Sequence, residues 1–250
     1  MNYLGTKQYT YKDCNVVVLP YGKDDNVSYG KGAKNGPQAI IRASQEVELH
    51  PFPSDLKIHT MSNVKLSYSV LKSINDNKFV LTLGGDHSIT PDIYKHYNTD
   101  IVQFDAHSDL RDIYDNNKNS HACAMRRCME MNDNTKLFSF GIRNTSQSEE
   151  KYISENTDRI FRNVIPKNKD LYLTFDVDAF DVSLMPATGT PEPGGLLWNE
   201  TLDLIDTICK HNNIVAIDIV EHSPIVGIPA YDFVTAKLSY LLLKKSLKRG

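Results

Sequence analysis

Short runs of apolar residues, rich in β-branched and aromatic side chains, recur along the chain. They occupy residues 15–20, 79–83, 100–104, 136–140, 171–175 and 214–218. A continuous apolar run of this length is typical of a strand that is buried on both of its faces, as strands are in a parallel sheet. The pattern therefore predicts a parallel β-sheet built from segments that are far apart in the sequence.

Helical patterns lie between these runs. The first covers residues 36–48 and begins with Gly-Pro. The second covers residues 199–211, with a predicted Asn199 cap and apolar positions at helical spacing. The last covers residues 229–247. Because strand-like and helix-like segments alternate, the predicted fold class is α/β.

Polar and ionisable residues directly follow the strand-like runs. In chain order these residues include GGDHS, DAHSD, GIRN, DVDAFD and IVEHSP. The carboxyl ends of parallel strands lie along one edge of a sheet, and open α/β folds bind their ligands at that edge. We therefore expect the ionisable side chains of these segments to lie close together.

Asp105, His107 and Asp109 stand at alternate positions in DAHSD. The same alternation occurs on the solvent-facing side of a strand, and a lone HxD or DxD is more often a turn or a cap than a metal ligand. In an extended segment, however, three alternate side chains point to one side and can surround one ion. Asp176 and Asp178 repeat the spacing after another strand. Since buried carboxylates at this density repel one another without a counter-charge, the pattern favours a metal site.

His87 follows paired glycines and brings the candidate ligands to four aspartates and two histidines, without a cysteine. Such a set favours a hard divalent ion over a zinc ion held by thiolates. Six ligands suit two ions that share carboxylates, and the charges of two divalent ions and four carboxylates balance. We expect two Mn²⁺ per chain, with Co²⁺ or Fe²⁺ as alternatives. Two close divalent ions acidify a shared water to hydroxide at neutral pH, so the prediction is a hydrolase.

Composition and charge narrow the class of protein. A chain of 250 residues is expected to form a single domain over residues 1–250. Its 28 Lys and Arg stand against 31 Asp and Glu, a net charge of −3, which argues against nucleic-acid binding through a broad basic surface. The 4 cysteines contain no CxxC pair and are expected to be reduced, as in a cytoplasmic protein. Neither a signal-peptide pattern nor a membrane-spanning apolar run is found, so no membrane partner is expected.

Five motifs stand in the order typical of the arginase–agmatinase (ureohydrolase) family, which this chain resembles: GGDHS, FDAHSD, SHACAMRR, DVDAFDVSLMPATGTPEPGGL and DIVEHSP. The resemblance extends to SYGKGAKNGPQAIIRAS near the N-terminus and covers most of the chain. It implies a three-layer α/β/α fold around a mainly parallel sheet. It also implies two Mn²⁺ with Asp105 and Asp176 as bridging ligands, one ion held by His87, Asp105, Asp109 and Asp176, the other by Asp105, His107, Asp176 and Asp178.

Two further roles follow from the resemblance. His121 in SHACAM matches the family's active-site histidine, which moves a proton to the leaving amine, although by itself it is an ordinary loop histidine. Glu221 in DIVEHSP matches the carboxylate that pairs with the substrate guanidinium, and a planar carboxylate can orient that group. Asp86 and Asp181 are expected in turns or behind the ligands. Cys123 has no base arranged to make it a nucleophile.

The loops indicate which guanidine is hydrolysed. LRDIYDNNKNSHA, and Glu192 in GTPEPGG, resemble the agmatinase members of the family, which predicts conversion of agmatine and water to putrescine and urea. SHACAM departs from the SHGTPF or SHATPF of many such members. If Arg111 faces the pocket, it disfavours a cationic tail and favours guanidinobutyrate. The alternative is that Arg111 makes a structural ion pair.

Other functions stay open from the sequence. Arginine and formiminoglutamate are alternative substrates. Related zinc deacetylases keep one metal site, whereas His87 and Asp109 complete a second one here. A non-catalytic metal-binding homologue would be expected to have lost ligands, and all six are present. The resemblance further implies a homo-oligomer, a trimer or a hexamer.

Overall fold

A computed structural model describes residues 1–27, 29–50, 52–53 and 55–247 of the chain. Within these ranges eight strands form one fully parallel sheet in the order β2-β1-β3-β8-β7-β4-β5-β6. The strands are β1 (Val16–Tyr21), β2 (Ile58–Thr60), β3 (Phe79–Gly84), β4 (Asp100–Phe104), β5 (Leu137–Phe140), β6 (Ile160–Arg162), β7 (Asp170–Asp176) and β8 (Asn213–Val220). All six predicted strands are therefore confirmed, and β2 and β6 are additions at the two edges of the sheet.

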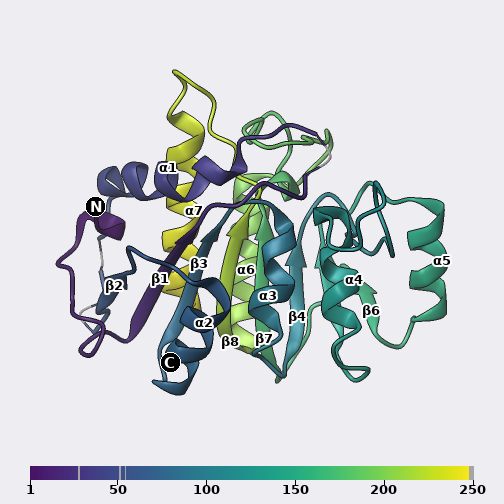
Figure 1. The fold of residues 1–250 in the computed structure, drawn as a ribbon, viewed down its shortest axis with the longest axis horizontal. Coiled ribbons are helices and arrows are strands. Elements are labelled where there is room, and N and C mark those ends of the chain that lie inside the picture. The colour runs from purple at the N-terminus through teal and green to yellow at the C-terminus, as the bar shows by residue number, and fades with distance from the viewer. Residues whose placement is uncertain (28, 51, 54, 248–250) are drawn as a thin grey trace.

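Helices cover both faces of the sheet, which gives the three layers of an α/β/α fold (Figure 1). One apolar cluster joins one face of the sheet to α1, α6 and α7, and a second joins the opposite face to α2, α3 and α4. The helices are α1 (Gly36–Ala43), α2 (Leu66–Asn75), α3 (Thr90–Tyr94), α4 (Ala124–Met129), α5 (Gln147–Glu155), α6 (Trp198–His211) and α7 (Ala230–Ser246). The predicted α/β class is confirmed.

The three predicted helices differ from the observed ones at one or both ends. The helix expected over residues 36–48 ends at Ala43 and continues only as a 3₁₀ turn over Ser44–Glu46. The expected cap Asn199 is wrong, because α6 begins at Trp198 and Asn199 lies inside its first turn. The side chain of Glu200 accepts the backbone N–H of Leu197 at 3.4 Å, so a carboxylate in the first turn takes part of the capping role. Of the predicted segment 229–247, residues 230–246 form α7.

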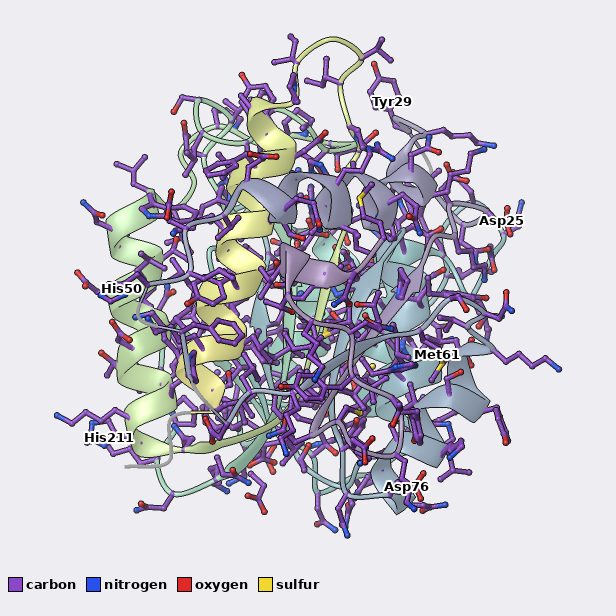
Figure 2. The ribbon with its side chains drawn as sticks, turned by 90° about the vertical axis from the view of Figure 1, so that its left-hand side faces the viewer. Asp25, Tyr29, His50, Met61, Asp76 and His211 are labelled. Carbon is purple, nitrogen blue, oxygen red and sulfur yellow. The ribbon has the colours of Figure 1, made fainter. Side chains whose placement is uncertain are left out.

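The loops that leave the carboxyl ends of the strands gather at one end of the molecule. In Figure 1 purple and green loops cross above the sheet at this end. Figure 2, turned by 90°, places Tyr29 at the same end, and Asp76 and His211 at the opposite end. Among the described residues, no helix has the length and apolar content needed to cross a membrane.

The aromatic core directly supports the loop end of the sheet. Phe104, the last residue of β4, stacks on Phe140 of β5 with ring centroids 5.4 Å apart, and on Phe175 of β7 at 5.0 Å. All three rings are at most 2% exposed. Stacked rings on adjacent strands fix the register of β5, β4 and β7 just before the ionisable segments begin.

Candidate metal centre

Four neighbouring strands bring the predicted site residues together. β3, β8, β7 and β4 are adjacent in the sheet, and each ends in one of the ionisable segments. The side chains they deliver are His87 after β3, Glu221 after β8, Asp176 and Asp178 at the end of β7, and Asp105, His107 and Asp109 after β4. The expected convergence at the carboxyl edge is therefore seen in the structure.

Carboxylate oxygens surround the ring nitrogen Nδ1 of His87. Oδ2 of Asp109 lies 3.0 Å from it, Oδ2 of Asp105 3.3 Å, and Oδ2 of Asp176 3.5 Å. The imidazole is fully buried. His87, Asp105 and Asp176 have ligand atoms close enough to share one ion, and we call these three residues the inner group.

A second group shares Asp105. Nδ1 of His107 lies 2.9 Å from Oδ2 of Asp178 and 3.7 Å from Oδ1 of Asp105. Asp105, His107 and Asp178 also have ligand atoms within reach of one ion, and we call them the outer group. The side chain of His107 is 25% exposed, so this group faces the solvent more than the inner group does.

The chemistry of these donors fits divalent cations. Although three carboxylates lie near it, Nδ1 of His87 makes no hydrogen bond within the part of the chain that the structure describes. A buried nitrogen lone pair among carboxylate oxygens has the chemistry and geometry of a metal ligand. Oxygen and imidazole donors suit Mn²⁺ and related ions better than soft ones.

Electrostatics point the same way. Burial and the neighbouring Asp109 and Asp178 raise the pKa of Asp105 to about 7. Burial alone would lower the pKa of His107, but Asp178 and Asp105 raise it to about 10. In metal-free protein, Asp105 and His107 therefore keep protons at pH values where these side chains would ordinarily release them. Bound cations would displace these protons.

The backbone is strained at two of these positions. Asp109 has φ 52° and Glu221 has φ 63°, both in the left-handed region that residues other than glycine rarely adopt. The extended segment expected through Asp109 therefore ends before it, and the left-handed turn is compatible with Asp109 reaching the inner group. Gly85 allows the β3 loop to pack closely, since a Cβ there would lie 1.8 Å from the carbonyl oxygen of Lys23.

His121 and Glu221 face each other beside the inner group. Oε1 of Glu221 accepts the backbone N–H of His87 at 2.8 Å and lies 3.2 Å from Nδ1 of His121. Burial opposes protonation of His121, but the Glu221 carboxylate raises its pKa above the ordinary value. A cavity of about 190 Å³ opens here, lined by both residues and by His107, Asp109, Asp176 and Asp178.

The outer wall of this cavity carries Arg111, Tyr114 and Glu149. Nε of Arg111 lies 3.5 Å from Oε2 of Glu149, and its guanidinium stacks 4.5 Å from the ring centroid of Tyr114. Glu149 is buried and also accepts the Ser108 hydroxyl at 2.7 Å. Arg111 thus makes the ion pair that was one of its two expected roles, and it also lines the cavity.

Glu192 lies on the same wall, with its side chain 32% exposed. Its Oε1 accepts Nδ2 of Asn144 at 2.6 Å and lies 3.7 Å from Nε2 of His107. Glu192 is therefore placed beside the outer group. Asn144 was not among the predicted site residues, although it lies in GIRN, which follows β5 at the same edge of the sheet.

The remaining candidates lie in structural positions. Asp86 accepts the backbone N–H of Ser88 at 3.0 Å, and Asp181 accepts that of Ser183 at 2.9 Å. Burial raises the pKa of the Cys123 thiol to about 11, which disfavours a thiolate nucleophile.

Comparison with known proteins agrees with this architecture. The model of the arginase family matches residues 13–244. The chain is 30% identical to the N(1)-aminopropylagmatine ureohydrolase of Synechocystis sp., over 94% of this chain and 90% of that protein. It is 33% identical to the agmatinase of Pyrococcus horikoshii, over 85% of each. The crystal structure of a putative agmatinase from Clostridium difficile superposes with a TM-score of 0.85 at 28% identity, covering 95% of this chain and 98% of that one.

Proposed function

Because this chain belongs to the arginase family, whose members hydrolyse linear amidines, we propose that it is a binuclear manganese enzyme that converts agmatine and water to putrescine and urea. The observation that carries the proposal is the pair of ligand groups sharing Asp105, with Glu221 and His121 on one wall of the adjoining cavity. A site of this kind unites a place for two cations with a carboxylate for a guanidinium.

The six predicted ligands are the residues that would hold the metal. His87, Asp105, Asp109 and Asp176 surround the inner position, and His107 and Asp178 complete the outer one with Asp105. When bound, two divalent cations supply a water molecule acidified to a nucleophile at neutral pH. Asp105, which belongs to both groups, would be shared between the two cations, and the family resemblance implies the same role for Asp176.

Glu221 orients the substrate. Its carboxylate is buried to 5% exposure at the cavity wall, and the backbone N–H of His87 fixes one of its oxygens at 2.8 Å. A guanidinium paired with this carboxylate presents a planar carbon in a defined orientation, and removal of such a buried partner typically costs about 2–5 kcal/mol.

His121 supplies the proton for the leaving amine. Its Nδ1 lies 3.2 Å from Glu221, so the ring stands beside the position of the guanidinium nitrogens. The raised pKa of His121 favours its protonated form near neutral pH, as a general acid requires. Transfer of this proton to the departing nitrogen releases a neutral amine in place of an unstable anion.

The charge balance of the cavity supports a dicationic substrate. Two divalent cations would neutralise the four aspartate ligands. With His121 protonated, Glu149, Glu192 and Glu221 stand against the positive charges of Arg111 and His121, which leaves one negative charge on the lining. Agmatine carries two positive charges, one on its guanidinium and one on its amine. Arginine and guanidinobutyrate each carry an additional carboxylate, which the lining would repel.

N(1)-aminopropylagmatine is a second candidate substrate. The Synechocystis relative is named for it, and its polyamine tail is also cationic. Guanidinobutyrate is less favoured than the sequence allowed, because Glu149 offsets the charge of Arg111.

A urea-release assay on the Mn²⁺-loaded protein tests the function, with agmatine, N(1)-aminopropylagmatine, arginine and guanidinobutyrate compared at equal concentration. We expect the highest kcat/KM with agmatine. Faster turnover of arginine or guanidinobutyrate than of both cationic-tailed substrates would overturn the charge argument. Urea from none of the four would overturn the proposal. Parallel loading with Co²⁺ and Fe²⁺ tests the choice of metal.

Two properties complete the proposal. The 4 cysteines, all within the described ranges, are free, which suits a reducing cytoplasm. A trimeric or hexameric assembly is proposed from the family resemblance, and light scattering on the purified protein tests it.

A further inference from the structure

A row of polar side chains crosses the middle of the sheet just below the metal centre. In register across five adjacent strands, Thr82 lies beside Asp218, Asp218 beside Thr174, Thr174 beside Gln103, and Gln103 beside Ser139. Each is at most 3% exposed. Buried polar groups are costly unless they are hydrogen-bonded, so a row of five within an apolar core calls for an explanation.

The row lies one side-chain step below the ligands on the same face of the sheet. Along a strand, residues two apart point to the same face. Gln103 is two residues before Asp105, and Thr174 two residues before Asp176. This is the face covered by α2, α3 and α4. The polar row therefore lies directly beneath the inner group, on the same face of the sheet.

The middle of the row holds His87 through Thr174. The hydroxyl of Thr174 donates to Oδ1 of Asp218 at 2.6 Å, so its oxygen is left to accept the Nε2 proton of His87 at 2.9 Å. Asp218 is fixed in turn, because it also accepts the Thr90 hydroxyl at 2.9 Å and the Tyr172 hydroxyl. A proton held on Nε2 leaves the lone pair of Nδ1 facing the carboxylates.

The next residue of the row, Gln103, holds Asp105. Nε2 of Gln103 donates to Oδ2 of Asp105 at 2.8 Å and to the carbonyl oxygen of His107 at 3.1 Å. Oε1 of Gln103 accepts the Ser139 hydroxyl at 2.9 Å, which sets the direction of the amide. Both contacts of Gln103 with the β4 loop therefore depend on the same oriented amide.

We propose that this row positions the metal ligands: Thr174 and Asp218 set His87 as an Nδ1 ligand, and Gln103 and Ser139 set the shared carboxylate of Asp105. The inference rests on the metal centre of the proposed function and adds residues to it that touch neither metal nor substrate. Outer partners of this kind typically change metal affinity by about 10–100-fold.

Thr82 provides a matched control. It belongs to the same row and is fully buried, but its hydroxyl has no hydrogen-bond partner within the described ranges. Thr82→Val and Thr174→Val make the same chemical change at the same level of the sheet, on the two strands that flank β8. Only the second removes the acceptor of the His87 proton.

The test is a Mn²⁺ titration of metal-free protein, followed by electron paramagnetic resonance and calorimetry, with thermal unfolding as a check of folding. We expect Thr174→Val to weaken one of the two Mn²⁺ sites by about 10–100-fold. Thr174→Ser, which keeps the hydroxyl, should restore the affinity, and Thr82→Val should bind as the wild type does. Gln103→Leu should weaken both sites, because Asp105 is shared.

The inference is overturned if folded Thr174→Val and Thr82→Val bind Mn²⁺ with the same affinity as the wild type. It is also overturned if Thr174→Ser binds as weakly as Thr174→Val, since the effect would then come from packing. If wild-type protein binds no Mn²⁺, the proposed metal centre fails along with it. Normal wild-type binding with an unaffected Thr174→Val overturns only the positioning role.

Discussion

The inner and outer groups use the same kinds of ligand and share Asp105, yet the protein holds them differently. His87 of the inner group is fully buried, and the Thr174 hydroxyl, borne on a central strand, lies 2.9 Å from its second ring nitrogen. His107 of the outer group is 25% exposed. Its second ring nitrogen lies 3.7 Å from Glu192 on a loop, beyond hydrogen-bond distance.

The difference separates a rigid position from an adjustable one. Strand-borne supports are fixed by the ladder on both sides, whereas loop residues move more easily. The inner group is therefore expected to be set by the fold, and the outer group to adjust more readily. Variants that affect one group, both groups or their supports test this comparison.

The largest effect is expected where the two groups meet. Asp105→Asn removes a shared charge and should lower urea release by at least about 1,000-fold. It should also lower the Mn²⁺ content below two ions per chain. Because burial raises the pKa of Asp105 to about 7, the metal-free variant should be no less stable than wild type at pH 8. Activity, metal content and thermal unfolding are the measurements.

Asp100→Asn is the matched control for this variant. Asp100 begins the same strand at the opposite edge of the sheet and pairs with Lys169 at 3.0 Å. The control should keep both activity and metal content. Undiminished turnover in Asp105→Asn would contradict a two-metal mechanism.

The next effect separates the groups by their burial. In metal-free protein, His87→Ala should lower the free energy of unfolding by about 2–4 kcal/mol, because it leaves a cavity and removes the buried hydrogen bond from His87 to the Thr174 oxygen. His107→Ala, at a position that is only partly buried, should lower the free energy of unfolding by about 1 kcal/mol. Urea denaturation at pH 6 measures both. Equal losses would show that the two groups are supported alike.

The strands and the ligands could be read from the sequence for the same physical reason. A strand buried on both faces must be continuously apolar, and a metal edge must be ionisable, so the transition from FVLTL to GGDHS marks both. The edge strands β2 and β6 have three residues each, too few for a pattern. The predicted helix ends were less accurate, because Glu200 provides part of the N-terminal capping that was expected from Asn199.

The support of the ligands was not predicted. Thr174 in LYLTF and Gln103 in DIVQF are single polar residues inside apolar runs. A single polar residue in such a run does not by itself predict a functional role. Their common position, two residues before a ligand on neighbouring strands, is a signal only once the register is known. Likewise, Asn144 reaches Glu192 across 48 residues, a contact that no local spacing encodes.

A pH effect reports the protonation of these groups in metal-free protein. The folded state retains protons on Asp105, with pKa about 7, and on His107, with pKa about 10, which the unfolded chain releases near pH 4 and 6.5. Stability should therefore fall as pH rises, between about pH 4 and 7 through Asp105 and between about 6.5 and 10 through His107. The pKa values of His87 and Asp176 are also raised, so these two residues act in the same direction. The lowered pKa of Asp178 acts only in more acidic solution.

Thermal unfolding from pH 5 to 9, with and without Mn²⁺, checks this expectation. Mn²⁺ binds the deprotonated ligands, so its stabilising effect should grow with pH. His107→Gln should flatten the upper part of the metal-free profile and leave the lower part. A metal-free wild type that becomes more stable from pH 5 to 9 would contradict the assigned protonation.

The smallest effect is expected at the loop support of the outer group. Glu192→Gln keeps the size of the side chain and removes the charge 3.7 Å from His107. Because this contact is long and 32% of the Glu192 side chain is exposed, the affinity for Mn²⁺ should fall only about 3-fold, less than for Thr174→Val. Glu150→Gln, which removes the charge of an exposed ion pair with Arg162, is the control and should leave the affinity for Mn²⁺ unchanged.

The same variant separates two roles of Glu192. If its charge serves the substrate tail, KM for agmatine should rise while KM for arginine falls, because only agmatine lacks a carboxylate that the loop repels. If the charge of Glu192 acts only on His107, the ratio of KM for agmatine to KM for arginine should stay the same as in the wild type. A loss of Mn²⁺ affinity as large as that of Thr174→Val would mean that loop and strand hold the two groups equally firmly, and the distinction between a fixed and an adjustable position would be wrong.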